Sequence, residues 1–221
     1  MRAANVFFAE TGIENMGVHI KMQKRIPVGA GMAGGSSDAA AVLRALNKLC
    51  GTRLDRARLE EIAAHIGSDV AFCVCGGTQL ASGRGALLSP LPPMPECGVV
   101  VCKPALSVSP PELFRRLDAV KLRCHPDTQG IIELLHEGNL PKIARRMYNV
   151  FEDVPDRRHN EIAAIKSTML DCGALGAVMT GTGSAVFGLY DDDKAAERSL
   201  KTLRRDWRCV SPAKIMPRID V

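Results

Sequence analysis

Residues 27–41 read Pro-Val-Gly-Ala-Gly-Met-Ala-Gly-Gly-Ser-Ser-Asp-Ala-Ala-Ala, and this stretch decides the fold of the chain. Five of the nine positions 27–35 are proline or glycine, and an alanine-rich run with helical spacing follows. A flexible backbone that passes directly into a helix can direct its N–H groups at an anion. The helix end adds about half a positive charge at the same place. The stretch therefore predicts a phosphate-binding loop.

Three kinds of phosphate-binding loop compete for this stretch. A Walker loop requires a lysine after its last glycine, and none follows here. The dinucleotide spacing G-x-G-x-x-G is present from Gly29 to Gly34, but Asp55, at the position of the ribose-binding acid, is expected to begin a helix rather than end a strand. The third kind ends in Ser-Ser at a helix start, where amides hold nucleotide phosphates and a hydroxyl reaches a metal-bound oxygen. A glycine loop without any ligand is the structural alternative.

Two further polar segments stand beside apolar runs. Asp69 lies in Ile66–Val70, between an expected helix and an apolar run, where an aspartate is most often a cap or turn residue. The sequence Met179–Ser184 reads Met-Thr-Gly-Thr-Gly-Ser and predicts a glycine turn between two strands. Neither segment decides the function alone.

The hydrophobic pattern of the rest of the chain predicts a mixture of helices and strands. Helices are expected near 2–10, 36–50, 55–65, 111–118, 128–136, 139–151, 157–172 and 192–205, with Ser36 or Ser37 as the cap of the second. Strands are expected at 18–24, 70–75 and 98–102, and residues 177–190 are expected to form a strand, a glycine turn and a second strand. The proline-rich segment Leu91–Pro95 predicts a boundary between two domains, 1–95 and 96–221.

The composition excludes several classes of protein. The 221 residues carry a formal net charge of +5, and one tryptophan and two tyrosines offer little surface for stacking bases, so no nucleic-acid partner is expected. We find no signal peptide and no apolar run of 18 residues, and the eight cysteines lack C-x-x-C spacing. These features predict a cytoplasmic protein with free thiols and no membrane segment.

Taken together, the motifs resemble the GHMP small-molecule kinases over nearly the whole chain. Residues 24–49 are similar to the ATP loop of that family, and Ile66–Phe72 is similar to the segment that carries its catalytic aspartate. Segments 102–114, 125–128, 149–152 and 173–190 are similar to the second half. The resemblance is greatest to the branch whose substrate is a cytidine-diphosphate-linked methylerythritol.

The resemblance implies an α+β fold with two domains. These are a ribosomal-protein-S5-like ATP-binding domain, here truncated, and a ferredoxin-like C-terminal domain. It also implies ATP-dependent phosphorylation of the 2-hydroxyl of that small-molecule substrate, in the non-mevalonate synthesis of isoprenoid precursors. Because phosphoryl transfer depends mostly on positioning and charge stabilisation, one carboxylate and a fixed phosphate site suffice.

The resemblance also assigns the site residues. Asp69 would accept the proton of the attacking hydroxyl, and Ser36 or Ser37 would lie near Mg²⁺. The ATP phosphates would be held by Pro27, Val28, Gly29, Ala30, Gly31, Met32, Ala33, Gly34, Gly35, Ser36, Ser37, Gly181, Thr182, Gly183 and Ser184.

The chain departs from the family pattern at its start. Members open with a strand pair bearing a Pro-Ala-Lys-Ile-Asn-Leu type motif, whose lysine is thought to act beside the aspartate, and an aromatic–histidine segment that grips cytosine follows. Lys21, Lys24 and Arg25 stand in no such motif. Since the loss of one preorganised donor costs about 10²–10³ in rate, weak or absent activity is expected. A nucleotide-binding protein without catalysis is the alternative, and an NAD-dependent oxidoreductase is the third.

Overall fold

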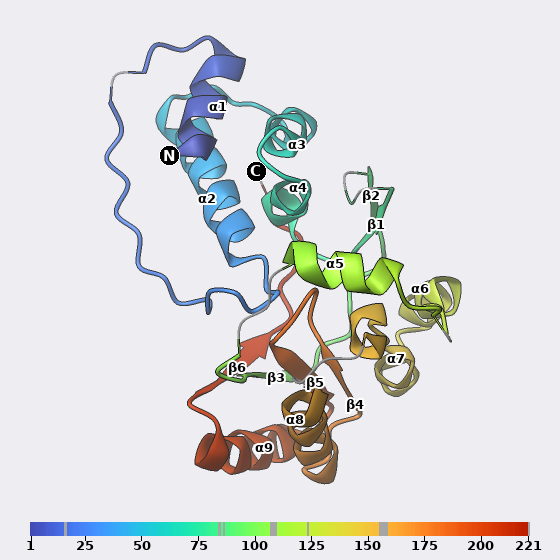
Figure 1. Cartoon of the computed structure of the whole chain (residues 1–221). Coiled ribbons are helices and arrows are strands. Elements are labelled where there is room, and N and C mark those ends of the chain that lie inside the picture. The colour runs from blue at the N-terminus through green and yellow to red at the C-terminus, as the bar shows by residue number, and fades with distance from the viewer. Residues whose placement is uncertain are drawn as a thin grey trace. The chain divides into compact units, whose positions relative to one another are not determined.

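The computed structural model describes residues 1–15, 17–83, 85, 87–106, 110–122, 124–154 and 159–220. The chain divides into two compact units, whose elements are labelled in Figure 1. The first unit contains Met1–Ile26, Ala33–Pro93 and Met216–Val221, and the second contains Pro27–Met32 and Met94–Ile215. The chain thus passes between units inside the proline-rich segment and also at 26/27, 32/33 and 215/216. The expected division into domains 1–95 and 96–221 stays a prediction.

The first unit is mainly helical in the part of the chain that the structure describes. Its elements are α1 (Arg2–Thr11), α2 (Gly34–Leu49), α3 (Arg56–Ala64), α4 (Ser68–Cys75) and the antiparallel strands β1 (Gln79–Ser82) and β2 (Leu87–Pro90). Asp55 caps α3 because its Oδ1 accepts a hydrogen bond of 2.9 Å from Arg58 N. The helices expected near 2–10, 36–50 and 55–65 are confirmed.

The four helices of the first unit share one apolar core. Each helix contributes residues three or four positions apart, the spacing of a single helix face. The core includes Phe7, Phe8, Leu43, Leu46, Leu59, Ile62, Val70 and Val74. Fully burying side chains of this size stabilises the fold by about 1.5–3 kcal/mol each.

Helix α4 corrects the expected strand at 70–75. Its buried residues are Val70, Ala71, Val74 and Cys75, and the helix packs against α2 and α3. A short apolar run cannot be assigned to strand or helix from periodicity alone. The spacing of the buried residues is helical, so the prediction of a strand was wrong.

The strand expected at 18–24 is also wrong. Among the described residues, no backbone hydrogen bond joins this segment to a neighbour, and a strand exists only through such bonds. Val18 is 37% and Met22 51% exposed, although their alternation with polar residues is that of a half-buried strand. The segment instead runs beside α2, where the two line a groove described below.

The second unit contains a four-stranded sheet. Its strands are β3 (Gly98–Lys103), β4 (Gly176–Met179), β5 (Val186–Tyr190) and β6 (Cys209–Lys214), in the order β4-β5-β3-β6 and antiparallel throughout. Its helices are α5 (Pro110–Asp118), α6 (Thr128–Glu137), α7 (Leu140–Arg146), the 3-10 turn η1 (Val150–Asp153), α8 (His159–Asp171) and α9 (Asp193–Asp206).

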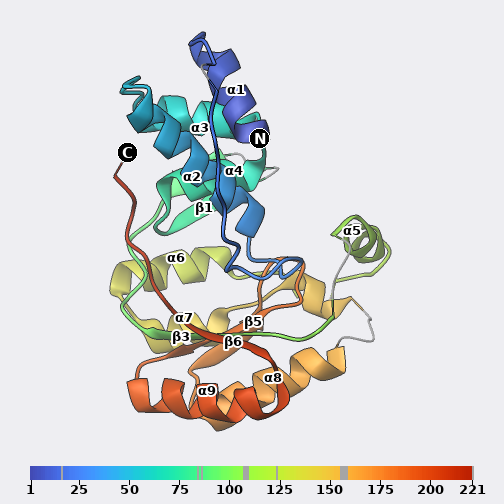
Figure 2. The same cartoon turned by 90° about the vertical axis from the view of Figure 1, so that its left-hand side faces the viewer.

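Helices cover both faces of this sheet (Figure 2). Val100 and Cys102 of β3 pack with residues of α8 and α9 on one face. Val99 and Val101 point to the other face and pack with α7. Successive side chains of a strand point to opposite faces, so the uninterrupted apolar run at 98–102 is the pattern of a strand covered on both sides.

The second unit tests the remaining sequence expectations. The strands at 98–102 and 177–190 and the helices near 111–118, 128–136 and 192–205 are confirmed. The helix expected at 139–151 is broken into α7 and η1, because Met147, with φ of −58° and ψ of 129°, leaves the helical conformation. Of the helix expected at 157–172, the structure describes α8, and residues 157 and 158 lie outside the described part. Strand β6 was not foreseen.

The α+β class is confirmed, and the dinucleotide-binding alternative is wrong. A dinucleotide-binding fold requires parallel strands and a ribose-binding acid at a strand end. Every described strand pair is antiparallel, and Asp55 caps a helix. Within the described ranges, no helix is long and apolar enough to cross a lipid bilayer.

Candidate functional site

The glycine loop at residues 27–32 belongs to the second unit and offers unpaired N–H groups. Gly29 and Gly31 have φ of 64° and 70°, in the left-handed region that favours glycine. Among the described residues, the N–H groups of residues 28–32 donate no hydrogen bond. Backbone turns that alternate in hand expose successive N–H groups and form anion-binding concavities. The loop therefore has the donors that a phosphate requires.

This loop is held by the glycine turn between β4 and β5. Thr180 Oγ1 donates a hydrogen bond of 3.0 Å to Gly31 O, and Ala185 N donates one of 3.1 Å to Ala30 O. The turn itself is closed by bonds of 2.9 Å from Thr180 N to Ala185 O and from Gly183 N to Thr180 O. Two glycine-rich segments that lie about 150 positions apart in the sequence thus form one structure within the second unit. The resemblance had placed both segments at the same phosphates, but Thr180, whose hydroxyl joins them, was not among the predicted site residues.

The approach of the two segments leaves no room for side chains. A Cβ at Gly31 would overlap Thr180 O and lie 2.8 Å from Gly183 N, and a Cβ at Gly181 would lie 2.8 Å from Gly31 O. Ser184 is fully buried, and its hydroxyl donates a hydrogen bond of 2.6 Å to Leu106 O. The predicted residues Gly181, Gly183 and Ser184 therefore form and support the turn, and Thr182 lies half-buried within it.

The start of α2 lies in the first unit and corrects the expected cap. The helix begins at Gly34 after Ala33, whose φ is 48°, so Ser36 and Ser37 are the third and fourth helical residues and neither caps the helix. Ser37 N donates a hydrogen bond of 2.9 Å to Ala33 O. In the described part of the chain, the N–H groups of Gly34, Gly35 and Ser36 have no acceptor. Such free N–H groups at a helix start favour an anion.

One ion pair, without net charge, lies beside the helix start. Lys24 Nζ pairs with the Asp38 carboxylate, and a Cβ at Gly34 would lie 3.6 Å from the same nitrogen. The two side chains are 37% and 28% exposed, so the pair is screened by solvent and contributes little to stability. Its main consequence is that an ammonium group is held next to the unpaired N–H groups of α2.

Asp69 lies in the first unit as the second residue of α4. Its side chain is exposed, and among the described residues it accepts no hydrogen bond. Burial raises the pKa of the Cys73 thiol, and the Asp69 charge one turn away raises it further, whereas Arg44 opposes both effects. Arg44 belongs to α2 and donates a hydrogen bond of 2.7 Å to Cys73 O, which ties the two helices together. No hydrogen bond joins Asp69 to Ser36 or Ser37 in the described part.

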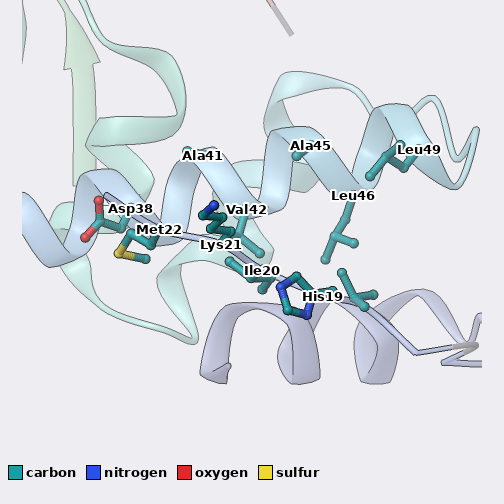
Figure 3. Close-up of a pocket in the computed structure, with 11 residues that line it drawn as sticks. His19, Ile20, Lys21, Met22, Asp38, Ala41, Val42, Ala45, Leu46 and Leu49 are labelled. Carbon is teal, nitrogen blue, oxygen red and sulfur yellow. The ribbon is translucent and has the colours of Figure 1, made fainter. Parts of the chain in front are cut away.

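A groove runs along α2 in the first unit (Figure 3). Its volume is about 320 Å³, and it lies between residues 18–22 and the exposed face of the helix. Asp38 and Met22 lie at one end of it, and Leu49 lies at the other. The lining is mainly apolar, with His19 and Lys21 as its nitrogen-bearing side chains. Nothing in the sequence had indicated this groove.

The chain offers no protein-only metal site among the residues that the structure describes, since no group of three or more His, Cys, Asp or Glu side chains is placed to hold an ion. This arrangement fits Mg²⁺ that arrives with nucleotide phosphates, because Mg²⁺ keeps several waters and takes few ligands from the protein. The hydroxyls of Ser36 and Ser37, which have no hydrogen-bond partner among the described residues, have the chemistry of a ligand for it.

Comparison with known families and proteins gives a consistent result. Residues 1–77 match the GHMP kinases N terminal domain, and residues 131–209 match the GHMP kinases C terminal domain. A 4-diphosphocytidyl-2-C-methyl-D-erythritol kinase of Alkaliphilus metalliredigens is 43% identical over 202 residues, which is 91% of this chain and 69% of that protein. A protein of the same description from Listeria monocytogenes serotype 4a is 46% identical over 189 residues, 86% of this chain and 65% of that protein.

Solved structures resemble the chain in fold as well. A crystal structure of 4-(cytidine 5'-diphospho)-2C-methyl-D-erythritol kinase has a TM-score of 0.79 at 33% identity, over 96% of this chain and 76% of that one. Mevalonate kinase from L. major has a TM-score of 0.76 at 20% identity, over 97% of this chain and 76% of that one, which shows the fold alone. The chain spans between 64% and 69% of the length of the curated relatives it matches.

Proposed function

The chain belongs to the GHMP kinase family, and from this premise we propose that it transfers the γ-phosphoryl group of ATP to the 2-hydroxyl of 4-(cytidine 5'-diphospho)-2-C-methyl-D-erythritol. The identity of 43–46% with kinases of that description supports the choice of substrate. The observation that carries the proposal is the loop at 27–32, whose N–H groups have no acceptor in the part of the chain that the structure describes and whose conformation is held by the turn at 180–185.

In the proposed reaction, the backbone of the second unit binds nucleotide phosphates. The N–H groups of residues 28–32 donate to phosphate oxygens. The turn that supports this loop is formed by Gly181, Thr182, Gly183 and Ser184. Because hydrogen bonds within the chain hold the turn and the loop, we expect the donors to be arranged before the nucleotide binds. Preorganised donors stabilise developing charge without a cost of reorganisation during the reaction.

The first unit supplies the groups that act on the acceptor and the metal. The Asp69 carboxylate accepts the proton of the 2-hydroxyl while that oxygen bonds to the γ-phosphorus and the bond to the β-phosphate oxygen breaks, releasing ADP. The hydroxyls of Ser36 and Ser37, and the N–H groups at the start of α2 that have no acceptor among the described residues, would hold a Mg²⁺–phosphate group. Mg²⁺ when bound neutralises charge on the transferred group.

The proposal is tested with the chain, MgATP and the cytidine-diphospho substrate. ADP release in a coupled assay and the mass of the product report transfer, and calorimetry with MgATP alone reports binding. The same substrate without its 2-hydroxyl is the matched control and is expected to give no product. Binding of MgATP with no transfer would favour the nucleotide-binding alternative, and absence of both binding and transfer would contradict the proposed function.

A further inference from the structure

The 3-10 turn η1 lies against the strand end that leads into the glycine turn. The Asn149 side chain uses all of its polar atoms there: Nδ2 donates hydrogen bonds of 2.8 Å to Met179 O and of 2.8 Å to Gly181 O. Its Oδ1 accepts a bond of 3.0 Å from Phe151 N, within η1 itself. Because an amide has one oxygen and two donor hydrogens, these bonds fix the rotamer and the orientation of the side chain.

Glu152, the third residue of η1, binds the same end of β4, but through the N–H of Met179 rather than its carbonyl. Its Oε1 accepts a hydrogen bond of 2.7 Å from Met179 N, and its second oxygen pairs with Lys166 of α8. The Glu152 side chain is 18% exposed, so the pair is more protected than a surface ion pair. Both backbone polar groups of Met179 are therefore bound: its N–H by Glu152 of η1, and its carbonyl by Asn149, the residue that caps η1. Bonds to a charged group are also stronger than neutral ones.

We infer that Asn149 and Glu152 are positioning residues for nucleotide binding, acting through the glycine turn. Met179 immediately precedes Thr180, whose hydroxyl binds Gly31 O, and Gly181, whose carbonyl binds Asn149 directly. Displacement of this strand end would carry Thr180 away from Gly31 and release the loop at 27–32. This inference rests on the proposed function, since it assigns the loop to ATP.

A purely structural role for Asn149 makes a different prediction. An amide that only satisfies buried backbone groups contributes to stability, and its loss lowers the unfolding temperature without changing nucleotide affinity. A positioning residue changes affinity through the geometry of groups that it does not itself present to the ligand. The two roles therefore separate in a binding measurement on a folded variant.

The test uses Asn149→Asp in the full chain. Aspartate keeps the shape and the oxygen that accepts Phe151 N, but it replaces the donor to Met179 O and Gly181 O by a second acceptor. Asn139→Asp is the matched control, because Asn139 lies in the same unit and uses only its Oδ1, which accepts from Lys142 N at 3.2 Å. Glu152→Gln keeps an acceptor for Met179 N, whereas Glu152→Ala does not.

Two readouts are measured on each variant. Amide hydrogen exchange by NMR follows Gly183 N and Ala185 N, the donors that close the turn and hold the loop, and Val100 N in β3 is the reference. Calorimetry gives the MgATP dissociation constant. For Asn149→Asp we expect exchange of both amides to be about tenfold faster and MgATP binding to be about tenfold weaker, with Asn139→Asp unchanged. Glu152→Gln is expected to restore most of what Glu152→Ala loses.

Two results for Asn149→Asp would overturn the inference. It is wrong if exchange at Gly183 and Ala185 stays at the parent rate in Asn149→Asp, or if exchange rises while MgATP affinity does not change. Failure of the proposed function is seen separately, in the parent chain: a parent that binds no MgATP contradicts that function. The exchange rates of Asn149→Asp then show by themselves whether this residue holds the turn.

Discussion

The glycine turn at 180–185 and the first turns of α2 and α4 are polar segments of similar length, but they use their polar groups differently. In the turn, the backbone groups of Thr180 and Ala185 and the hydroxyl of Ser184 are all engaged in hydrogen bonds of 2.6–3.1 Å within the second unit. In the first unit, the side chains of Ser36, Ser37 and Asp69 have no hydrogen-bond partner among the described residues. The comparison separates two sets of residues. We call the hydrogen-bonded turn at 180–185 and the loop that it holds the frame, and we call the side chains of Ser36, Ser37 and Asp69 the free groups, which are available to a ligand.

The largest expected effect is on the free groups. Asp69→Asn removes the proton acceptor but keeps the size of the side chain, and general-base catalysis contributes about 10²–10⁴ in rate. We expect turnover to fall by that factor, measured by ADP release with the cytidine-diphospho substrate. The Asp69 side chain is exposed and accepts no hydrogen bond from the described residues, so the unfolding midpoint should not change.

Asp38→Asn is the control for this first prediction. Asp38 is also a carboxylate of the first unit, but it is already paired with Lys24. A turnover in Asp69→Asn equal to that of the parent, or an equal loss in both variants, would show that the free carboxylate has no special role.

The next effect concerns the frame. Gly31→Ala places a Cβ against Thr180 O at a residue whose φ is 70°. Overpacking costs about 1–3 kcal/mol, and the left-handed conformation adds about 1–2 kcal/mol. Urea unfolding should show a loss of stability in this range, and MgATP affinity should fall with it.

Two other glycines allow the strain of the left-handed backbone to be measured separately from the steric overlap. Gly51 has a φ of 64° but no heavy atom near its Cβ position, so Gly51→Ala reports conformational strain without a clash. Gly35 lies in α2 with open space around it, and Gly35→Ala is expected to leave stability unchanged or raise it slightly. If Gly31→Ala costs no more than Gly51→Ala, the two glycine segments are not in tight contact.

Tyr190 is the last residue of β5, the strand that follows the turn, and it tests whether hydrogen bonds at the far end of this strand also stabilise the second unit. Its hydroxyl donates a hydrogen bond of 2.6 Å to Ser199 Oγ, and both residues are fully buried. Tyr190→Phe leaves Ser199 without this partner, so we expect a loss of about 1–3 kcal/mol at neutral pH in urea unfolding.

The same residue predicts a loss of stability in alkali. Burial raises the pKa of Tyr190 to about 12, and the hydrogen bond to Ser199 opposes part of that shift. The unfolded value is about 10, so between about pH 10 and 12 the folded state holds a proton that the unfolded state has lost. The contribution of the neutral Tyr190 side chain to the free energy of unfolding is complete below about pH 10 and is lost as the pH rises from about 10 to about 12. Unfolding midpoints of Tyr190→Phe should therefore decline less steeply there; equal slopes in both proteins would contradict the assignment.

The last prediction concerns thiol reactivity, which reports the opening of each unit separately. Burial is the main cause that raises the pKa of Cys75 in the first unit and of Cys102 in the second to about 12, so both are neutral and slow to react near pH 8. Gly31→Ala should accelerate labelling of Cys102 by about fivefold for each kcal/mol lost and leave Cys75 unchanged. Equal acceleration of both would mean that the loop does not belong to the second unit alone. Exposed Cys124 is the internal reference.

The sequence predicted the elements whose signals are local. Asp55 and Asp192 cap helices in the structure because each side chain accepts from a backbone N–H two or three residues ahead. The turn at 179–184 was predicted because two apolar strands flank a Gly-x-Gly sequence. The six confirmed helices and both strands of that hairpin needed no information from elsewhere in the chain.

The errors arose where distant contacts decide. Residues 18–24 alternate as a strand does, but alternation cannot supply the neighbouring strand that this segment lacks. Residues 70–75 are helical because their apolar groups pack against α2 and α3. Strand β6 contains Pro212 and mostly exposed residues, and it forms because proline is tolerated at the edge of a sheet. The bond from Thr180 to Gly31 has no local signal at all.

The most direct test of the division between frame and free groups is a calorimetric titration of MgATP into Asp69→Asn and into the parent chain. If Asp69 acts only on the acceptor hydroxyl while the glycine loop binds the phosphates, the two dissociation constants should agree within about threefold, although transfer is lost in the variant. A MgATP affinity that falls tenfold or more in Asp69→Asn would contradict this division.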